Sequence, residues 1–435
     1  MLIELVLIAT ILVVLYINFL HIILWEESKK EIIKNKIKIL PSVSIIVPAH
    51  NEEGNISRII NNIANLNYPK EKIEVILIDD GSSDATYEIM KKEVKKMKRK
   101  NEAKKISWKI LKNNARLGKA TSLNKGIRIA RKRFVAVIDA DSKLHEDALY
   151  HCMLRFFDDG KENLDVAAVT SNILVDKNSR LLQKLQNIEF MLIASLRKLQ
   201  ERLNIIMATP GPLSVFRRDV LLKLGGFDES NLTEDIEIAW RLLAHNYKIR
   251  MAFDAKVWSD YPATLKKWWK QRTRWNLGGF QTLLKYIKEV RKNPALRKFI
   301  IPYSLAGYLL TTLGVFIAIY LFYNAIANFL DYFFEALRVG INPISRISFR
   351  YAIDVFTIFG VFVFSTSLYL LYNGIKMQRK TRVKKIIKNA KLELIPLIIF
   401  ITFYIMLFPI VLVYSLFKFI LLIKEGDIKK AWLTK

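Results

Sequence analysis

The chain has 435 residues and a formal net charge of +29; 52% of its residues are hydrophobic and 25% are charged. The hydrophobic residues gather toward the two ends and the charged residues lie mostly between them, so neither a wholly soluble nor a wholly membrane-embedded protein fits. The single cysteine, Cys152, excludes an internal disulfide. It fits a reducing cytoplasm, and we expect a buried structural thiol.

A net charge this high is also typical of nucleic-acid-binding proteins. Here the lysines are scattered through residues 91–105, 265–298 and 376–391, and they do not alternate with aromatic residues on one groove-binding element. Two of these runs flank apolar segments, where attraction to anionic lipid headgroups explains them. We therefore expect membrane lipids, and no nucleic acid, as partners.

The first predicted element is a membrane anchor at residues 5–25, which are apolar and long enough to span a bilayer. No Lys or Arg precedes them and they carry no small-residue cleavage pattern, so we interpret them as an anchor and not as a removed signal peptide. Five lysines follow within residues 29–38. By the positive-inside rule, the amino terminus is expected outside and the next domain in the cytoplasm.

Residues 43–170 alternate between short apolar runs and longer amphipathic ones. The apolar runs are rich in β-branched residues and indicate buried strands, and the others have helical periodicity. This β-α-β-α pattern predicts a mostly parallel sheet covered on both faces, with ligands outside the carboxyl ends of its strands. The expected strands are residues 44–49, 75–79, 134–139 and 166–170, and the expected helices are residues 52–65, 84–98 and 119–132.

Polar side chains follow three of these strands at the point where each ends. They are His50, Asn51 and Glu52 after the first strand, Asp79 and Asp80 at the second, and Asp139 and Asp141 at the third. Each has a structural alternative, because Asn51 and Asp84 are also suited to cap helices and Asp80-Gly81 to turn the chain. Asp139-Ala140-Asp141 is harder to explain in this way, since two acids one residue apart concentrate negative charge. A Mg²⁺ or Mn²⁺ ion that bridges phosphates would offset that repulsion.

A basic loop precedes the third expected helix. Asn114, Arg116, Gly118 and Lys119 lead into a helix that contains Asn124. A helix amino terminus with nearby cations is suited to contact a diphosphate, and a solvated loop is the alternative. The chain has no G-x-G-x-x-G dinucleotide fingerprint after the first strand, no P-loop, no zinc spacing and no G-x-S-x-G elbow.

Residues 262–298 are rich in tryptophan and lysine. We expect an interfacial amphipathic helix, or a pair of helices interrupted at Gly278-Gly279, with the tryptophans in the headgroup layer. Within this segment, residues 271–275 (QRTRW) combine guanidinium groups that suit phosphate oxygens with an indole on which a sugar ring can stack. An interfacial belt with snorkelling cations is the alternative.

Three apolar stretches come late, at residues 300–323, 351–373 and 392–423. The cationic residues 376–391 should be cytoplasmic. Counting crossings from a cytoplasmic central domain leaves the carboxyl terminus outside, but Lys424, Lys429 and Lys430 argue against that. The last stretch is long for one span and short for two, and its prolines Pro396 and Pro409 would allow a re-entrant or incomplete hairpin, so its topology stays open.

The order of these motifs resembles the membrane-integrated family 2 glycosyltransferases, which include cellulose, chitin, hyaluronan and poly-N-acetylglucosamine synthases. The resemblance covers about residues 40–300, and the arrangement of anchor, catalytic domain and late spans looks most like the rhizobial chitooligosaccharide synthases. The motifs are PAHNEE (48–53), IDDGSSD (78–84), NARLGKATSLNKG (114–126), DAD (139–141), TPGPLSVFRRD (209–219), GGFDESNLTEDIEIAWRL (225–242) and QRTRW (271–275).

The resemblance implies an α/β GT-A fold, Rossmann-like, that takes a sugar from a nucleotide diphosphate and inverts the anomeric centre with Mg²⁺ or Mn²⁺. The residues that would bind the nucleotide sugar are Pro48, Glu52, Asp79, Asp80, Lys119, Asp139, Ala140 and Asp141, with Asp80 at the base and Asp139 and Asp141 on the metal. Those that would bind the departing diphosphate and the acceptor are Gln271, Arg272, Arg274 and Trp275. Asp235 would be the general base, with Glu234 beside it.

The residues themselves agree with this assignment. Direct displacement at an anomeric carbon needs a base near the acceptor hydroxyl and charge stabilisation at the leaving group. Asp235 stands at a helix start, because Glu237, Ile238 and Trp240 continue a helical pattern. Helix capping is the alternative for Asp235.

One loop departs from the family pattern. Residues 210–214 read Pro-Gly-Pro-Leu-Ser where the family often has Phe-Phe-Cys-Gly-Ser, which puts the identity of the acceptor in doubt but not the chemistry. Four spans are few for one subunit to enclose a polysaccharide channel. Either subunits cooperate in a homo-oligomer, or the product is a short oligosaccharide or a lipid.

Three functions follow as hypotheses. The first is a synthase at the cytoplasmic face of a multi-pass cell-membrane protein that elongates a β-linked polymer from a UDP-sugar. The second transfers one sugar to a lipid such as a polyprenyl phosphate or a ceramide-like lipid. The third is a basic membrane protein that is not an enzyme and binds nucleic acid or anionic lipid. The expected divisions are an anchor (1–27), a cytoplasmic GT-A domain (40–260), interfacial helices (261–298) and a transmembrane region of about three segments (299–435).

Overall fold

The structure is a computed structural model that describes residues 2–28, 39–100, 103–176, 180–288, 296–340, 342, 355–380 and 394–425. The five lysines within residues 29–38, most of the cationic stretch 376–391, and Lys429 and Lys430 lie outside these ranges.

An eight-stranded sheet forms the centre of the α/β domain, in the order β3-β2-β1-β4-β9-β8-β10-β5. The pairs β1–β2, β1–β4, β2–β3 and β8–β10 are parallel, and β9 is antiparallel to both β4 and β8. The predicted mostly parallel sheet is therefore confirmed. The strands are β1 (Val43–Ala49), β2 (Ile73–Asp79), β3 (Ser107–Lys112), β4 (Phe134–Val137), β5 (Lys143–Leu144), β8 (Val166–Val175), β9 (Ser214–Arg217) and β10 (Lys248–Ser259), beside a separate hairpin of β6 (Phe157–Asp158) and β7 (Lys161–Glu162).

The strands that were not expected from the sequence include β3, β9 and β10. In β3, Trp108 is the one buried residue among exposed and half-buried neighbours, because the strand lies at the sheet edge and lacks a continuous apolar run. In β9 only four residues pair, and in β10 the register with β8 shifts between Ala252 and Lys256. Short or interrupted strands give weak periodic signals, so their absence from the prediction has a physical cause.

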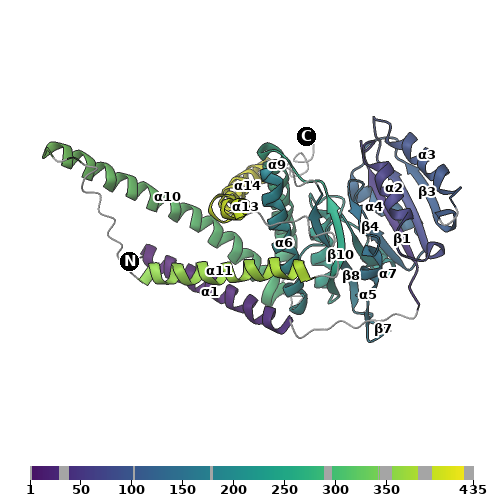
Figure 1. Ribbon diagram of the computed structural model, residues 1–435, viewed down its shortest axis with the longest axis horizontal. Coiled ribbons are helices and arrows are strands. Elements are labelled where there is room, and N and C mark those ends of the chain that lie inside the picture. Colours follow the sequence, from purple (N-terminus) through teal and green to yellow (C-terminus); the bar gives the residue numbers. More distant parts are fainter. Residues whose placement is uncertain are drawn as a thin grey trace.

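Helices cover both faces of the sheet (Figure 1). One face packs against α2 (Ile56–Ala64), α3 (Thr86–Met97) and α5 (Ala148–Leu154), and the other against α4 (Lys119–Ile129), α7 (Arg218–Lys223) and α8 (Glu234–Ala244). Cys152 lies fully buried in the first layer, as predicted, and burial raises the pKa of its thiol.

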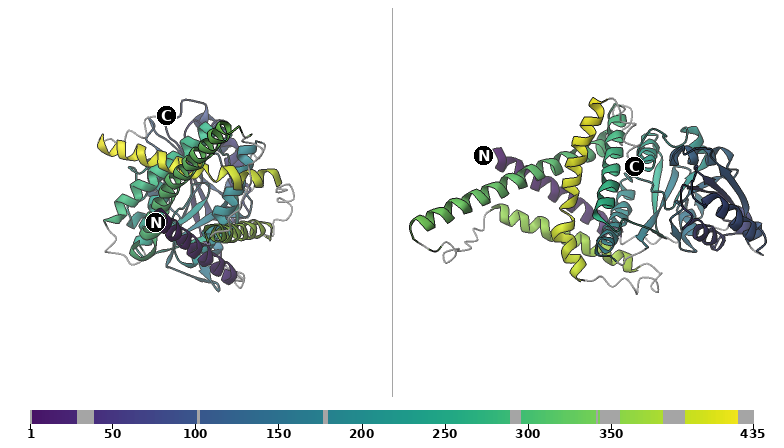
Figure 2. Two further views of the ribbon diagram at one scale, coloured as in Figure 1. Left: turned by 90° about the vertical axis from the view of Figure 1, so that its left-hand side faces the viewer. Right: turned by 90° about the horizontal axis from the view of Figure 1, so that it is seen from above.

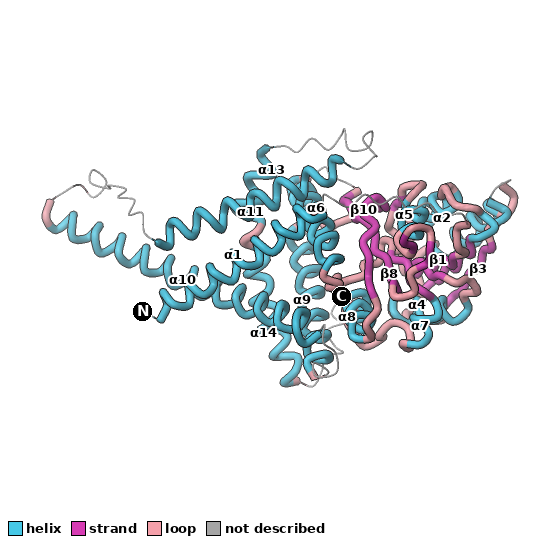
Figure 3. The backbone as a smooth tube through the Cα atoms, turned by 90° about the horizontal axis from the view of Figure 1, so that it is seen from below, coloured by secondary structure: helices cyan, strands magenta, loops and turns pink. Residues whose placement is uncertain are grey.

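Within the described residues, four helical segments are long and apolar enough to cross a membrane. They include α1 (Leu2–Ser28), α10 (Ile301–Arg338), α11 (Val355–Lys380) and the broken segment of α13 (Leu394–Ile399), η4 (Phe400–Tyr404, a π-helix) and α14 (Leu407–Lys424). The helix α10 continues well past the stretch 300–323 that the sequence predicts. Figure 3 shows the strands confined to one end of the molecule and these helices at the other.

The last of these segments is oriented unlike the other three. In Figure 2, α14 (yellow) runs across the direction of α1, α10 and α11, and it packs against α9 (Leu265–Ile287). Pro409 lies near the start of α14, after the turn that follows η4.

Two long helices, α6 (Leu181–Arg202) and α9, stand between the sheet and the membrane helices (Figure 1). Two alternatives were open for this segment, one helix or a pair interrupted at Gly278-Gly279. The structure has the first, because α9 is continuous through both glycines. A side chain at Gly278 would collide with that of Thr233, and one at Gly279 would meet the Tyr308 hydroxyl of α10. These glycines therefore permit close helix packing and do not end the helix.

The expectation that the tryptophans of this segment lie in the headgroup layer is wrong for Trp268. Its side chain is fully buried against Tyr404 and Phe408, at ring-centroid distances of 5.7 and 5.5 Å. Trp268 is therefore part of the contact between α9 and the last membrane segment.

A buried amide pair also joins the sheet to the membrane helices. Asn172 in β8 donates to the Gln378 side chain of α11 at 2.9 Å, and Gln378 donates back at 3.3 Å. Both side chains are buried. Within the helices, Asn18 of α1 donates to Thr366 and Ser367 of α11.

Candidate active site

The polar strand exits meet at one edge of the sheet. Ala49 pairs with Asp79 at the ends of β1 and β2, and the amide of Asp80 donates to the Ala49 carbonyl. The strand β4 lies on the other side of β1 and continues into Asp139-Ala140-Asp141. Because these strands are parallel, their carboxyl ends are neighbours, as the sequence predicts.

Asp80 holds the basic loop in place. Its buried carboxylate accepts hydrogen bonds from the backbone amides of Leu117 and Gly118, at 3.0 and 2.8 Å, and from the side chains of Asn113 and Ser122. Burial alone would raise the pKa of Asp80, but these bonds lower it. The neighbouring Asp79 has one buried carboxylate oxygen without a partner. Contact with a nucleotide base stays a prediction for both residues, and Asp79 has the freer oxygen.

Lys119 connects the strand ends to the start of α8. It is the first residue of α4, and its Nζ lies 2.6 Å from Asp139 Oδ1 and 3.1 Å from Glu234 Oε1. Burial disfavours its charge, but the two carboxylates raise its pKa and keep it protonated. A single ammonium group thus brings together residues about 20 and 115 positions away in the sequence.

The loop that departs from the family pattern has a steric role at this point. Gly211 accepts a hydrogen bond from the Asp139 amide at 3.1 Å. A Cβ at Gly211 would collide with the carboxylate of Asp139 and the ammonium group of Lys119. The glycine is therefore required for the ion pair to lie against the backbone.

The carboxylates around Asp141 form a site suited to a cation. Burial and the charges of Asp139 and Glu52 raise the pKa of Asp141 to about 7. Burial likewise raises the pKa of Glu52, although a hydrogen bond from Asn55 opposes the shift. Hard oxygen donors whose mutual repulsion needs a positive charge fit Mg²⁺ or Mn²⁺. Pro48, at the end of β1, and the buried Ala140 complete this edge.

Glu234 and Asp235 begin α8 and have different acidities. The backbone carbonyl of Asp235 accepts hydrogen bonds from the amide and the hydroxyl of Thr209, at 3.1 and 3.0 Å, which ties the helix start to the loop before Gly211. Burial and the charge of Glu234 raise the pKa of Asp235 to about 6, whereas Lys119 and Arg274 overcome burial and lower that of Glu234. Neighbouring acids with separated pKa values are typical of sites that transfer protons.

The helix α9 presents two different faces here. Gln271, Arg274 and Trp275 are spaced to share one face. Arg274 is exposed and its charge acts on Glu234 and Asp235, while the buried Gln271 carbonyl oxygen has no partner. Arg272 is different: its side chain is 3% exposed and ion-paired to Glu189 of α6. The structure therefore places Arg272 in the protein interior, apart from the acids at the strand ends.

Sequence reasoning missed three further residues beside this site. Tyr261 contacts Phe190 with the rings tilted by 39° and their centroids 4.1 Å apart, and Phe190 meets Trp275 edge-on at 6.4 Å. Arg197 of α6 has a pKa lowered by burial, and Tyr261 and Asp235 oppose that shift. Tyr261 lies two residues after the end of β10, so its position could be predicted only once that strand was known. The residues of α6 belong to no local motif.

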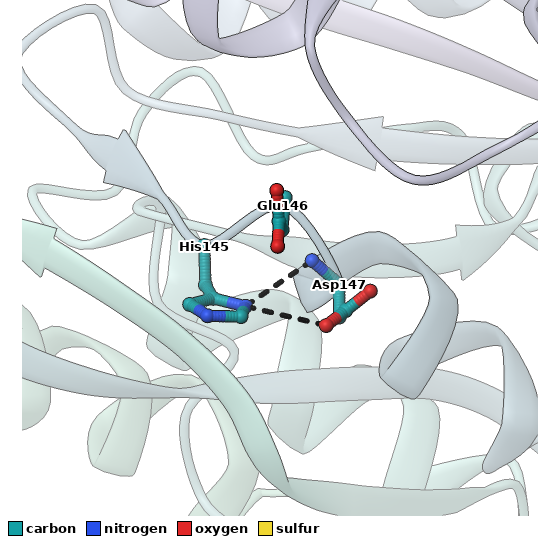
Figure 4. A group of neighbouring side chains, drawn as sticks. All are labelled: His145, Glu146 and Asp147. Atoms are coloured by element: carbon teal, nitrogen blue, oxygen red, sulfur yellow. Dashed lines mark hydrogen bonds and ion pairs between the residues drawn. The ribbon is translucent and has the colours of Figure 1, made fainter. Parts of the chain in front are cut away.

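A separate cluster of possible ligands lies in the loop after β5. In Figure 4, His145, Glu146 and Asp147 approach one another, with their ligand atoms within 4.8 Å. His145 Nδ1 already accepts a hydrogen bond from the Asp147 amide at 3.2 Å, and the Asp147 carboxylate accepts one from Asn67. These contacts are within the loop before α5 and between that loop and Asn67.

Comparisons with known proteins agree with this geometry. Residues 44–225 match the family model of glycosyl transferase family 2. A poly-beta-1,6-N-acetyl-D-glucosamine synthase from Staphylococcus epidermidis is 29% identical over 302 residues, which are 69% of each chain. A probable glycosyltransferase from Bacillus subtilis, YdaM, is 34% identical over 270 residues, 62% of this chain and 60% of that one.

A solved structure shares the fold. A mannosyltransferase from Pyrobaculum calidifontis, solved in complex with GDP-Man and Mn²⁺, aligns with 86% of this chain and 99% of its own, at a TM-score of 0.54 and 19% identity. The expected GT-A fold is thereby confirmed. The chain thus shares the fold of a solved glycosyltransferase, and its residues 44–225 are similar to glycosyl transferase family 2.

Proposed function

We propose that the protein transfers a sugar from a UDP-sugar to an acceptor hydroxyl with inversion at the anomeric carbon. The observation that carries the proposal is the ammonium group of Lys119, which joins Asp139 of the strand ends to Glu234 beside Asp235. Donor-binding acids and a base of raised pKa thus belong to one site, with the exposed cation Arg274 nearby.

In the proposed reaction, the acceptor oxygen attacks the anomeric carbon and its proton passes to the carboxylate of Asp235. The bond from the anomeric carbon to the diphosphate breaks, and the nucleoside diphosphate leaves with the electron pair. Arg274 and Lys119 stabilise the negative charge that develops on the leaving group. Glu234 stays ionised beside Lys119 and raises the pKa of Asp235, so that its carboxylate is a competent base near neutral pH.

Asp139 and Asp141 are the residues that would hold a Mg²⁺ or Mn²⁺ ion. When bound, the ion would neutralise charge on the donor diphosphate. Chelation with EDTA should abolish transfer, and added Mn²⁺ or Mg²⁺ should restore it. Full activity after chelation would show that Lys119 and Arg274 suffice.

For the product, we favour a β-linked polymer or oligosaccharide of N-acetylglucosamine. This choice rests on the relatives named as poly-beta-1,6-N-acetyl-D-glucosamine synthases, to which the chain is similar over more than the family domain. A screen of UDP-glucose, UDP-N-acetylglucosamine, UDP-glucuronate and GDP-mannose with protein in lipid bilayers would identify the donor. Radiolabelled product that is insoluble in organic solvent supports the polymer; a single labelled lipid would instead establish the lipid acceptor.

We further propose three membrane crossings, by α1, α10 and α11, with the catalytic domain and the carboxyl terminus in the cytoplasm. The crosswise direction of α14 and its packing on α9 favour a segment that does not cross the membrane alongside the other three. This arrangement also agrees with the lysines at and beyond the end of α14.

Single cysteines would test this topology in a Cys152→Ser background. An impermeant maleimide added to intact cells should label Val339→Cys after α10 and leave Glu425→Cys after α14 unlabelled until the cells are opened. Labelling of Glu425→Cys from outside would contradict the proposal.

A further inference from the structure

A buried polar network joins α6, α9 and the last membrane segment. Glu189 Oε2 accepts hydrogen bonds from Arg272 Nη2 and from the Tyr404 hydroxyl, both at 2.7 Å, and that hydroxyl accepts a third from the indole N–H of Trp268 at 2.8 Å. All four side chains are less than 10% exposed. Three elements that are distant in the sequence therefore depend on one carboxylate.

The guanidinium group of Arg272 also lies on the ring of Trp275, with its central carbon 4.1 Å from the ring centroid. This is closer than its approach to the rings of Trp268, Phe190 or Phe408, each at 5.6 to 5.8 Å. Stacking of a planar cation on an indole is favourable, more so away from water. This contact restricts the position of the Trp275 ring.

Trp275 is the residue at which the two faces of α9 meet. It is one turn from Gln271, whose buried carbonyl oxygen has no partner, and one turn from Arg272 on the other side. Taking the charges of Glu189 and Arg272 out of water costs free energy that offsets most of their attraction, so the ion pair adds little to stability. A buried pair of this kind can instead serve to hold a neighbouring group in one position. The neighbouring group here is the indole of Trp275.

We propose that Arg272, held by Glu189 and Tyr404, is a positioning residue that fixes the indole of Trp275 for the acceptor, so that the membrane segment 394–424 sets the geometry of the acceptor site. The role of Trp275 toward the acceptor rests on the proposed function. The chain of contacts from Tyr404 through Glu189 and Arg272 to Trp275 does not, and each part has its own test.

The first test needs no substrate. Tyr404→Phe removes one hydroxyl and leaves both buried charges and the ring packing in place, so the variant should fold. Thr402→Val is its matched control, because that exposed hydroxyl lies in the same segment and bonds only within its own helix, to Ile398. In protein labelled with 5-fluorotryptophan, the ¹⁹F resonance of Trp275, assigned through Trp275→Phe, should shift or broaden in Tyr404→Phe and stay unchanged in Thr402→Val. An unchanged Trp275 resonance in Tyr404→Phe would overturn the proposal.

The second test separates acceptor from donor. With UDP-N-acetylglucosamine and a β-1,6-linked N-acetylglucosamine oligosaccharide, Tyr404→Phe should raise the acceptor KM about fivefold, the effect of one hydrogen bond, and leave the donor KM unchanged. Hydrolysis of the donor by water should also be unchanged. Equal losses in transfer and hydrolysis would refute the positioning role. Absence of turnover in the wild type would refute the proposed donor and leave the ¹⁹F test to decide the inference.

A double-mutant comparison tests whether Tyr404 acts on the acceptor through Trp275. If Tyr404 acts through Trp275, Tyr404→Phe should have no further effect on the acceptor KM in a Trp275→Ala background. Effects that multiply in the double variant would show that Tyr404 acts by another route. Arg272→Lys should resemble Tyr404→Phe, since an ammonium group keeps the charge beside Glu189 but cannot stack on the indole as a planar group.

Discussion

At the strand ends the side chains of the site are held by backbone amides and by other side chains of the α/β domain, whereas Arg272 on α9 is held by side chains of other helices. Asp80 binds the amides of Leu117 and Gly118, and Gly211 leaves the space that the ion pair of Lys119 and Asp139 fills. Arg272 is instead held by Glu189 of α6 and, through it, by Tyr404. Under the proposed function, we call the first region the donor half (Glu52, Asp79, Asp80, Lys119, Asp139, Asp141) and the residues of α8 and α9 the acceptor half (Asp235, Gln271, Arg274, Trp275).

The two halves differ in the parts of the chain that must be folded before each can form. Main-chain contacts are present whenever the sheet and its loops are folded, so the donor half depends on residues 43–259 alone. The acceptor half needs α9 to be packed between the sheet and the segment 394–424. Under the proposed function, the donor half would form with the α/β domain, whereas the acceptor half would also depend on the segment 394–424.

The largest effect should come from Asp235→Asn. Without a base, transfer should fall roughly a thousandfold, because general base catalysis contributes about that much, while UDP binding is retained. Turnover and calorimetric titration with UDP measure the two quantities. Glu88→Gln, which alters an exposed acid on α3, is the control. Retention of transfer by Asp235→Asn would remove the residue from the mechanism.

The next prediction tests whether the donor half depends on the space that Gly211 leaves beside Asp139 and Lys119. Gly211→Ala should lower kcat/KM for the donor about a hundredfold, because the new Cβ displaces Asp139 and Lys119 by an amount that reacting groups do not tolerate. Gly54→Ala should have little effect, since nothing lies within 4 Å of a Cβ at that position. If Gly211→Ala instead raises only the acceptor KM, the division between the two halves is wrong.

The pH profile tests the base directly. Since the pKa of Asp235 is about 6 and the ionised form accepts the proton, kcat/KM should be level above that pH and fall about tenfold per unit below it. The measurement requires saturating Mg²⁺ or Mn²⁺, because protonation of Asp141 also competes with metal. A profile that stays level down to about pH 4 would exclude a base of this acidity.

The smallest effect should come from Gly278→Ala, which tests how closely α9 approaches Thr233. Overpacking costs about 1–3 kcal/mol, and the gain in helix propensity offsets about 1 kcal/mol of it. We expect a few-fold loss of transfer with unchanged donor KM, read from initial rates, and a small change in thermal unfolding. Gly307→Ala in α10, where a Cβ meets nothing, is the matched control. Wild-type transfer in Gly278→Ala would mean that this contact does not position Asp235.

The donor half could be predicted from the sequence because its signals are local. A buried parallel strand is a continuous apolar run, and Asp79, Asp80, Asp139 and Asp141 follow such runs directly. The short antiparallel β9 and the irregular β10 have no comparable pattern, so the position of Tyr261 after β10 could not be inferred.

The role of Arg272 could not be predicted for a different reason. Its partner Glu189 is 83 residues away, and Glu189 is 215 residues from Tyr404, with no motif around either. At Gly278-Gly279 the sequence left open whether one helix or two form, because two adjacent glycines are a typical sign of a helix break. In the structure, the close approach of Thr233 and Tyr308 explains the two glycines.

The amide pair of Asn172 and Gln378 has a consequence for how such chains evolve. Replacing one amide removes both bonds of the pair, although Asn172 keeps its bond to the Phe253 carbonyl. Among homologous sequences that keep this arrangement of sheet and membrane helix, positions 172 and 378 should therefore covary. An exchange of the membrane region between two such proteins should be tolerated best when residues 172 and 378 come from the same protein.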